Sequence, residues 1–442
     1  MTRAGWASCE ITPPLGLPMG GRGPRLAGGT EVLTPLQAGA VVLEDAAGTR
    51  AVLISLDLIG TDLGRNTELC LAIASAVGVA PAAVIVNSSH THSGPMMGIE
   101  RYATLQPKPP ELHQYELELN EKLLRLAIEA ARDLREVRVR WRDGATNIGI
   151  NRRLQTADGV VMAPNPDGCY HRQLWTLELQ TVADETQRCV LFSHGCHPVI
   201  VYGHNWTAIS SEWPGRCREL LRKELGDGLH SQFFQGLAGN VRPRVLADFE
   251  NRKFRKSTPQ DVEDTAREIA RDVLSTLRQP GDALELQLGA ERSFFLAHRQ
   301  PPPPRAHWEE RRDSTDELER EMSRYWLSRY EDDAIAPGET QPWPIGLFRF
   351  APEYSLVYVA GEPLCEWHAI FEEALPGQHL VSCGYTHAGA GYLPTDALLH
   401  EGGYEIDRSP SFSRSGPGAL RPGLNEAVTR ALHKLQAAVA AN

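Results

Sequence analysis

Short apolar runs typical of β-strands alternate with longer segments of helical periodicity along most of this sequence. AGAVVLED (38–45) and RAVLISLD (50–57) are joined by the turn-prone AAG, and a helical segment near 62–78 precedes a strand at 82–87. The same criteria predict helices at about 111–134, 214–225 and 261–277 and strands at 136–142, 171–182, 189–194 and 231–235. This alternation predicts an α/β (α+β mixed) fold with a mixed β-sheet core flanked by helices.

Residues 300–345 depart from that pattern. They open with QPPPPR, a stiff polyproline segment, and continue as a charged helical segment (307–333) with an aromatic stripe at Trp326 and Tyr330. Two interpretations stay open: a lid or a contact between copies in a homo-oligomer, and a solvated surface helix. Because the alternation resumes afterwards, we expect residues 1–442 to form a single large domain with an insertion at about 300–345.

Composition and charge exclude several classes of partner. The 442 residues carry a net charge of −11 and no basic cluster, so we expect no nucleic-acid partner. No apolar run approaches the roughly 18 residues that a transmembrane segment needs. The N-terminus lacks the apolar stretch of a secretion signal, and the eight scattered cysteines contain no CxxC pair. We therefore expect a cytoplasmic protein with mostly free, buried thiols.

Histidines gather where two of the predicted strands end. The stretch NSSHTHSGPMMG (87–98) carries His90 and His92, and LFSHGCHPV (191–199) carries His194 and His197. In an extended backbone, residues two apart lie on the same face, so each pair can present its imidazoles together. Neutral imidazole suits Zn²⁺, and a catalytic zinc usually has three protein ligands and an open position. The alternative is that these histidines are held by ordinary hydrogen bonds.

Neighbouring side chains offer further candidates. Ser93 beside His92 suggests a Ser–His nucleophile, but sequence neighbours rarely point at each other. Cys196, between His194 and His197, is expected to point to the opposite face. Met96 and Met97 follow the HTHSGP segment, where a lipid-cleaving enzyme would line its pocket.

The C-terminal region contributes a carboxylate and two tyrosines. Glu362 follows an apolar strand and a glycine, from where it can reach a shared cleft, although an acid favoured at the start of a helix is an equal interpretation. Tyr392 and Tyr404 lie in a glycine-rich segment (383–405) and are positioned to approach a bound ligand.

The ordered set of motifs resembles the catalytic domain of the neutral/alkaline non-lysosomal ceramidases. These motifs are AGWASCEITPPLGLPMGG (4–21), HTHSGP (90–95), NIGINRR (147–153), HPV (197–199), GLAGNVRP (236–243), AGE (360–362) and GYLPTDALLHEGGYE (391–405). The resemblance spans nearly the whole chain, and HTHSGP is its most specific element. It implies a short bacterial-type member without the C-terminal immunoglobulin-like domain of full-length ceramidases.

The resemblance also implies roles for individual residues. Ceramidases are zinc-dependent amidases that hydrolyse the N-acyl bond of ceramide. Carried over motif by motif, His90, His197 and Glu362 would bind one zinc per chain, and Tyr392 would complete the shell through its hydroxyl. His92, Arg152 and Tyr404 match the residues that hold the scissile amide and its developing oxyanion, and His92 is also the expected proton donor to the leaving amine.

One departure from the family bears on the substrate. Where ceramidases carry a serine in a GDVSPN-like segment, this chain has GNVRPR (239–244), which places Arg242 at the serine position. A guanidinium there can pair with a carboxylate or phosphate. We count Arg242, His194 and Asn240 as candidate substrate-binding residues.

These residues predict a zinc-dependent hydrolase that cleaves a linear N-acyl amide with zinc-activated water. A small or lipid-like N-acyl compound is the expected partner, with ceramide one candidate among others. The first alternative is a zinc-dependent esterase, lactonase or phosphoesterase that uses Arg242 to bind an anionic substrate. The alternative of another class is a non-catalytic metal-binding protein on the same fold, which a site with a tyrosine ligand and an exchangeable water argues against.

Overall fold

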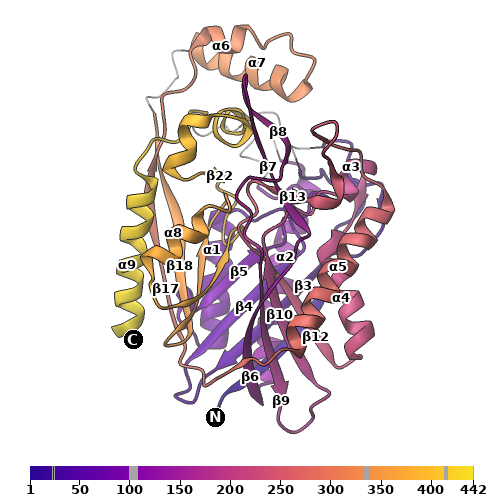
Figure 1. Cartoon of the computed structure of the whole chain (residues 1–442), viewed down its shortest axis with the longest axis vertical. Helices are drawn as coiled ribbons and strands as arrows, with labels where there is room; N and C mark the ends of the chain where they lie inside the picture. The colour runs from indigo at the N-terminus through magenta and orange to yellow at the C-terminus, as the bar shows by residue number, and fades with distance from the viewer. Residues whose placement is uncertain (22, 24, 99–107, 333–337, 413–416, 442) are drawn as a thin grey trace.

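Two β-sheets lie face to face, and helices cover the outer face of each (Figure 1). The computed structural model describes residues 1–442 except residues 22, 24, 99–107, 333–337, 413–416 and 442. The predicted α/β fold with a mixed sheet flanked by helices is confirmed.

The large sheet has the strand order β12-β10-β9-β6-β1-β3-β4-β5, with β16 beside β6. The pairs β4/β5 and β10/β12 are parallel and the other pairs are antiparallel. The bounds are β1 (Arg3–Glu10), β3 (Gln37–Glu44), β4 (Arg50–Leu56), β5 (Val84–Ser88), β6 (Arg135–Ala145), β9 (Gln173–Thr181), β10 (Arg188–His194), β12 (Leu229–Gln235) and β16 (Asp282–Leu284).

The smaller sheet has the order β17-β18-β19-β21. Its bounds are β17 (Gly289–His298), β18 (Thr340–Ala351), β19 (Tyr354–Val359) and β21 (His379–Cys383). Alternate residues of a strand face opposite sides, so Val41 and Leu43 of β3 belong to the buried cluster between the sheets that includes Phe348. Ala40 and Val42 belong to the cluster shared with α1 and α2. Burial on both faces explains why β3, β4 and β5 are nearly continuous apolar runs.

Helices cover the outer face of each sheet. One group packs on the large sheet, and α8 and α9 cover the smaller one. The bounds are α1 (Leu63–Val77), α2 (Pro110–Arg132), α4 (Glu212–Leu225), α5 (Pro259–Arg278), α8 (Trp367–Ala374) and α9 (Leu424–Ala441). The helices predicted at 62–78, 111–134, 214–225 and 261–277 are confirmed as α1, α2, α4 and α5. Of the described helices, none is long and apolar enough to cross a membrane.

Short strands and loops lie at one end of the large and the smaller sheet and surround the candidate site (Figure 1). β13 (Val241–Pro243), β7 (Gly149–Thr156) and β8 (Gly159–Asn165) form one antiparallel sheet, and β20 (Glu362–Pro363) pairs in parallel with β22 (Tyr392–Leu393). The remaining short elements are β2 (Glu31–Val32), α3 (Val201–His204), β11 (Ala208–Ile209), β14 (Ala247–Asp248) and β15 (Lys253–Phe254).

The segment predicted as an insertion connects β17 to β18 and stands at one end of the molecule (Figure 1). It contains two helices, α6 (Arg305–Glu309) and α7 (Glu317–Glu331), which we call the cap. The single helix predicted over 307–333 is broken because Asp316 caps the start of α7 with its side chain. Trp326 is buried with Trp308 of α6 and Phe412, so α7 is not solvated on every side. Residues 333–337 of the predicted insertion lie outside the described residues.

Candidate metal centre

Two buried amide side chains tie together the segments that carry the predicted ligands. Asn87, near the end of β5, accepts a hydrogen bond from the backbone N–H of Gln235, the last residue of β12, at 2.7 Å. The Gln235 amide donates in turn to the backbone carbonyls of Ser89 and Cys196, both at 2.9 Å. Each of these carbonyls directly precedes a predicted ligand. The two strand ends are therefore held in register with each other by directional bonds.

His90 lies at a turn and not in a strand. β5 ends at Ser88, and His90 has a φ of 66°, in the left-handed region that non-glycine residues rarely adopt. The prediction that His90 and His92 share one face of an extended strand is therefore wrong. The two imidazoles still meet, because the turn brings their Nε2 atoms to 3.2 Å from each other.

Backbone carbonyls orient the two imidazoles that face Glu362. His90 Nδ1 lies 2.6 Å from the Ile59 carbonyl, and His197 Nδ1 lies 2.7 Å from the Ala238 carbonyl. Nδ1 must carry the hydrogen in both rings, so both Nε2 atoms present a lone pair. Both Nε2 atoms lie 3.3 Å from the same oxygen of Glu362, Oε2.

This arrangement places three acceptors around one point. Burial lowers the pKa of His197 to about 4, with a contribution from Arg152, so that ring is neutral at pH 7. His197 Nε2 and Glu362 Oε2 are buried, and neither has a hydrogen-bond partner among the described residues. Buried lone pairs that converge in this way are destabilising unless a cation lies between them. The donor set of two imidazoles and one carboxylate fits a divalent metal such as zinc.

His92 differs from His90 and His197, whose Nδ1 atoms are held by backbone carbonyls. Since His90 Nε2 is an acceptor, His92 must direct its own Nε2–H at it, and His92 Nδ1 is buried without a partner among the described residues. The contact with His90 thus places the hydrogen of neutral His92 on Nε2 and leaves Nδ1 as an acceptor, with no backbone carbonyl holding the ring among the described residues. Burial lowers the pKa of His92 well below its usual value, and the neighbouring His90 lowers it further. His92 also belongs to a group with His90 and His197 whose ring nitrogens lie within 4.8 Å of one another.

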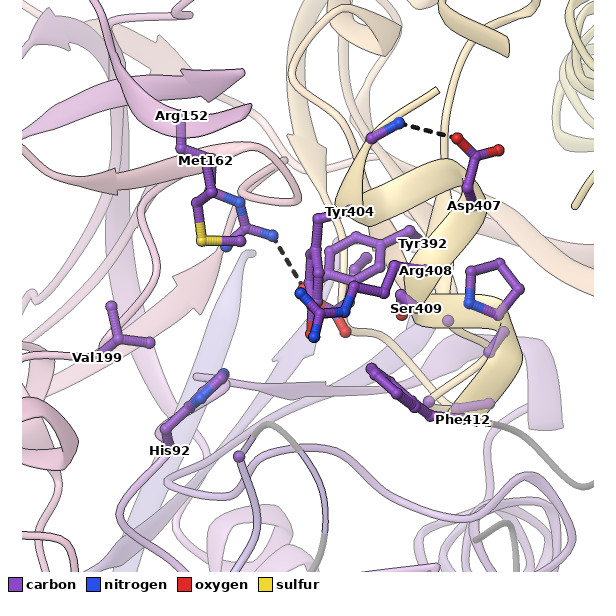
Figure 2. Close-up of a pocket in the computed structure, with 18 of the residues that line it drawn as sticks. His92, Arg152, Met162, Val199, Tyr392, Tyr404, Asp407, Arg408, Ser409 and Phe412 are labelled. Atoms are coloured by element: carbon purple, nitrogen blue, oxygen red, sulfur yellow. Dashed lines mark hydrogen bonds between the residues drawn. The ribbon is translucent and has the colours of Figure 1, made fainter. Parts of the chain in front are cut away.

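The carboxylate and the tyrosine come from neighbouring short strands. Glu362 of β20 pairs with Tyr392 of β22, so the two side chains start from adjacent positions. The interpretation of Glu362 as a helix-start acid is wrong, because the next helix, α8, begins at Trp367 and has Glu366 as its N-cap. The Tyr392 hydroxyl accepts a hydrogen bond from Arg152 Nη2 at 3.0 Å, drawn in Figure 2.

Arg152, which binds the Tyr392 hydroxyl, belongs to a buried network of ion pairs. Arg152 Nε and Arg153 Nη1 each donate to one oxygen of Glu405 at 2.8 Å. Burial alone would raise the pKa of Glu405, but the two guanidinium groups lower it. Tyr404, next to Glu405, meets Tyr392 edge-on with ring centroids 5.8 Å apart.

A cavity of about 810 Å³ opens beside these residues. It is lined by most of the predicted site residues, namely His92, Arg152, Arg242, Glu362, Tyr392 and Tyr404. Figure 2 shows His92 and Val199 on one side and Tyr392, Tyr404 and Phe412 on another. His90 and His197 do not line the cavity and are buried at 5% and 0% exposure.

Two predicted substrate-binding residues have structural surroundings instead. His194 is buried, with Nδ1 2.9 Å from the Gln173 carbonyl and Nε2 2.8 Å from the Tyr170 hydroxyl. Asn240 is also fully buried and donates to both oxygens of Glu366. Neither residue lines the cavity.

The predicted pocket methionines belong to the core. Met96 and Met97 are buried in the apolar cluster that includes residues of α1 and α2, and neither lines the cavity. Cys196 is likewise buried in a different apolar cluster, where its thiol faces the His197 carbonyl at 3.9 Å.

Three residues that sequence reasoning missed surround the histidines. The Tyr385 ring lies 4.3 Å from the His90 ring, and its buried hydroxyl has no partner among the described residues. Tyr202 lines the cavity and meets His92 edge-on at 5.4 Å. Arg25 donates to the backbone carbonyl of His92. None of the three residues belongs to the histidine motifs at the strand ends. Neither residue spacing nor hydrophobic periodicity could therefore identify them from the sequence.

Comparison with solved structures identifies the fold. The neutral ceramidase from Pseudomonas aeruginosa superposes with a TM-score of 0.74 at 18% identity, covering 100% of this chain and 74% of that one. A ceramidase solved in complex with C2 gives a TM-score of 0.72 at 18% identity, over 100% and 75% of the two chains. No family model and no curated protein matches the sequence. The chain has the fold of these ceramidases, as its motifs predict.

Proposed function

We propose that this protein is a zinc-dependent hydrolase that cleaves a linear N-acyl amide. The observation that carries the proposal is the convergence of His90 Nε2 and His197 Nε2 on Glu362 Oε2, each at 3.3 Å, beside a cavity. Two fixed lone pairs and a carboxylate form a three-ligand set of the kind found at catalytic zinc sites. The fold shared with two ceramidases supports an amide substrate.

The residues of this chain would have separate roles in binding the metal and in acting on the substrate. His90, His197 and Glu362 hold the metal, and Tyr392 stands beside Glu362 with its hydroxyl oriented by Arg152. Zinc, when bound at such a site, lowers the pKa of water to about 7 and polarises a carbonyl oxygen.

His92 and Tyr404 would act on the substrate. His92 lines the cavity in its neutral form, with Nε2 as a donor and Nδ1 as an acceptor that has no partner among the described residues. It can therefore accept a proton at one ring nitrogen and release one from the other, as transfer to the leaving amine requires. Tyr404 faces the same cavity and can donate its hydroxyl hydrogen to the negative charge that develops on the amide oxygen.

Metal analysis and three histidine variants test this assignment. The purified protein should contain about one zinc per chain. His90→Ala should lose both zinc and turnover, whereas His92→Ala should retain zinc and lose turnover. His400→Ala is the matched control, because that histidine is exposed and does not line the cavity. A wild-type protein that binds no zinc after reconstitution would contradict the proposal.

A substrate screen tests the reaction class. Zinc-loaded protein is offered N-acyl amides, esters and phosphoesters that share one acyl or leaving group, with ceramide among the amides. We expect the amides to be hydrolysed fastest. Faster hydrolysis of esters or phosphoesters would assign the site to a different reaction.

A further inference from the structure

Arg242 is a cationic side chain on the cavity wall with no acidic partner among the described residues. It lies in β13, opposite Ile150 of β7, and two residues after Asn240, whose carbonyl accepts the backbone N–H of Arg152. Its Nη1 approaches the thioether sulfur of Met162 at 3.8 Å, and its Cζ lies 4.6 Å from the centre of the Phe254 ring. Its Nε is buried and makes no hydrogen bond with a described residue.

The other arginines that line the cavity contrast with Arg242. Arg152 binds Glu405 and Tyr392, and Arg408 binds Glu319 of α7 at 2.6 Å. Arg299 donates to the side-chain oxygen of Gln341 at 2.8 Å and to the carbonyl of Gly418. Among the described residues, the guanidinium of Arg242 has no oxygen acceptor and contacts the Met162 sulfur and the Phe254 ring, so its N–H donors can bind a ligand.

The charge of Arg242 is retained in spite of these surroundings. Burial, with a contribution from the neighbouring Arg152, lowers the pKa of Arg242 to about 10, which still leaves it charged at neutral pH. Arg242 is half-buried with its Nε fully buried, and a partly desolvated cation without a counter-ion favours a bound anion. A guanidinium fork matches the two oxygens of a carboxylate in geometry and charge.

Apolar side chains adjoin this cation. Val161 and Met162 of β8 line the cavity and belong to the exposed large hydrophobic residues, at 44% and 40% exposure. Val199 and Phe412 line other parts of the wall (Figure 2). A ligand that fits this cavity therefore combines apolar surface with one negative charge.

We propose that the substrate is an N-acyl amino acid and that Arg242 binds the carboxylate on its amine portion. This inference rests on the amide hydrolase function proposed above. In the reaction, water adds its oxygen to the acyl carbon, the C–N bond breaks, and the nitrogen takes up the proton. The products are a carboxylic acid and a free amino acid. A single free guanidinium matches a monoanionic carboxylate better than a dianionic phosphate.

The experiment compares substrates that share one acyl chain and differ in the charge and identity of the amine portion. Zinc-loaded wild-type protein is assayed with N-dodecanoylglycine, N-dodecanoylglycinamide and N-dodecanoyl phosphoethanolamine. A charge-assisted bidentate contact should favour the carboxylate over the neutral amide by about tenfold or more in kcat/KM. Arg242→Ser, which installs the residue type of the ceramidases, should bring that ratio close to one. Arg244→Ser is the matched control, since Arg244 is exposed, lies in the same segment and does not line the cavity.

The outcomes separate this inference from the proposed function. Hydrolysis of charged and neutral amides with equal kcat/KM would overturn the carboxylate assignment and leave the amide hydrolase intact, and so would a preference for the phosphate. If no amide is hydrolysed, the proposed function fails. Binding of the hydrolysis-resistant pair N-dodecylsulfonylglycine and its carboxamide, measured by calorimetry on wild type and Arg242→Ser, then decides the anion site. Equal affinities of wild type for the pair would overturn it.

Discussion

At the candidate metal centre the imidazoles of His90 and His197 are held by backbone carbonyls, that of His90 by Ile59 and that of His197 by Ala238. In the cap, the buried side chains are held mainly by one another, with Trp326 stacked on Trp308 at 5.9 Å between ring centroids. The first region is built from directional bonds between distant segments of chain, and the second from non-directional apolar contacts within one segment and Phe412.

This difference indicates that the two regions serve different tasks. A metal centre needs ligand positions fixed to within a fraction of an ångström, which hydrogen bonds to the backbone provide. No residue of α6 or α7 lines the cavity, so the cap can move without displacing a site residue. The two meet at Phe412 and Arg408, which line the cavity and also contact the cap. Four changes test this division, and the largest effect is expected at the metal centre.

Glu362→Gln should abolish metal binding and turnover together. The change removes the negative charge on which His90 Nε2 and His197 Nε2 converge. Altered supporting residues typically weaken metal affinity about 10–100-fold, so loss of a ligand should exceed that range. Zinc titration and turnover measure the effect, with Glu373→Gln, exposed on α8, as the control. Retention of full zinc affinity would remove Glu362 from the ligand set.

Glu405→Gln should lower the free energy of unfolding by about 3–5 kcal/mol, because it leaves the buried Arg152 and Arg153 without their shared counter-ion. Urea denaturation gives the value. The control is Glu401→Gln, which removes a partly exposed partner of Arg153 and should cost about 1 kcal/mol or less. Equal losses in the two variants would show that the support behind Tyr392 does not depend on the buried pair.

His194 should make the framework of the metal centre sensitive to acid. Burial lowers its pKa from 6.5 to about 4, so between these values the unfolded chain binds the proton more readily. The free energy of unfolding should therefore fall as pH drops from 6.5 to 4, by up to about 3 kcal/mol from this group.

His194→Gln tests that contribution. Urea denaturation of metal-free wild type and variant at pH 7 and at pH 4.5 excludes the separate effect of metal loss. The fall in stability between the two pH values should be smaller in the variant. An identical fall in both proteins would assign the acid sensitivity to other groups.

Trp326→Ala should have the smallest effect on the chemistry. Removal of this buried ring loosens the cap cluster, at a local cost of about 3–5 kcal/mol. We expect a severalfold rise in KM for long-chain substrates, because Phe412 joins the cap cluster to the cavity, while zinc content stays at the wild-type value. Loss of zinc from this variant would mean that the cap and the metal centre are mechanically one unit.

Local patterns predicted the secondary structure well. The helical periodicity of 261–277 appears as α5, which buries Ala266, Ile269 and Val273 on one face. The break between α6 and α7 was missed, because the charged sequence around Asp316 continues the helical composition while its side chain caps a new helix. Met96 and Met97 were assigned to a pocket from their position in the chain, but burial depends on packing against α1 and α2.

The sequence predicted most residues of the candidate site but not how their side chains are arranged. His90 and His92 stand two apart in the sequence, and the rule for extended chains treats them as equivalent. The structure separates them through the backbone around them, since His90 Nδ1 meets the Ile59 carbonyl and His92 Nδ1 meets no described partner. Tyr385, Tyr202 and Arg25 surround the histidines through contacts over long sequence distances, which no local pattern encodes.

The sequence by itself determined the α/β alternation, the strand-end histidines and the arginine at position 242, because these follow from side-chain chemistry and short-range periodicity. Only the tertiary structure decided which nitrogens face Glu362 and which histidines are structural. It also decided that Arg242 lines the cavity with no acidic partner among the described residues. The physical reason is that tautomers, burial and charge balance are set by groups far apart in the chain. Their positions exist only once the two sheets have packed.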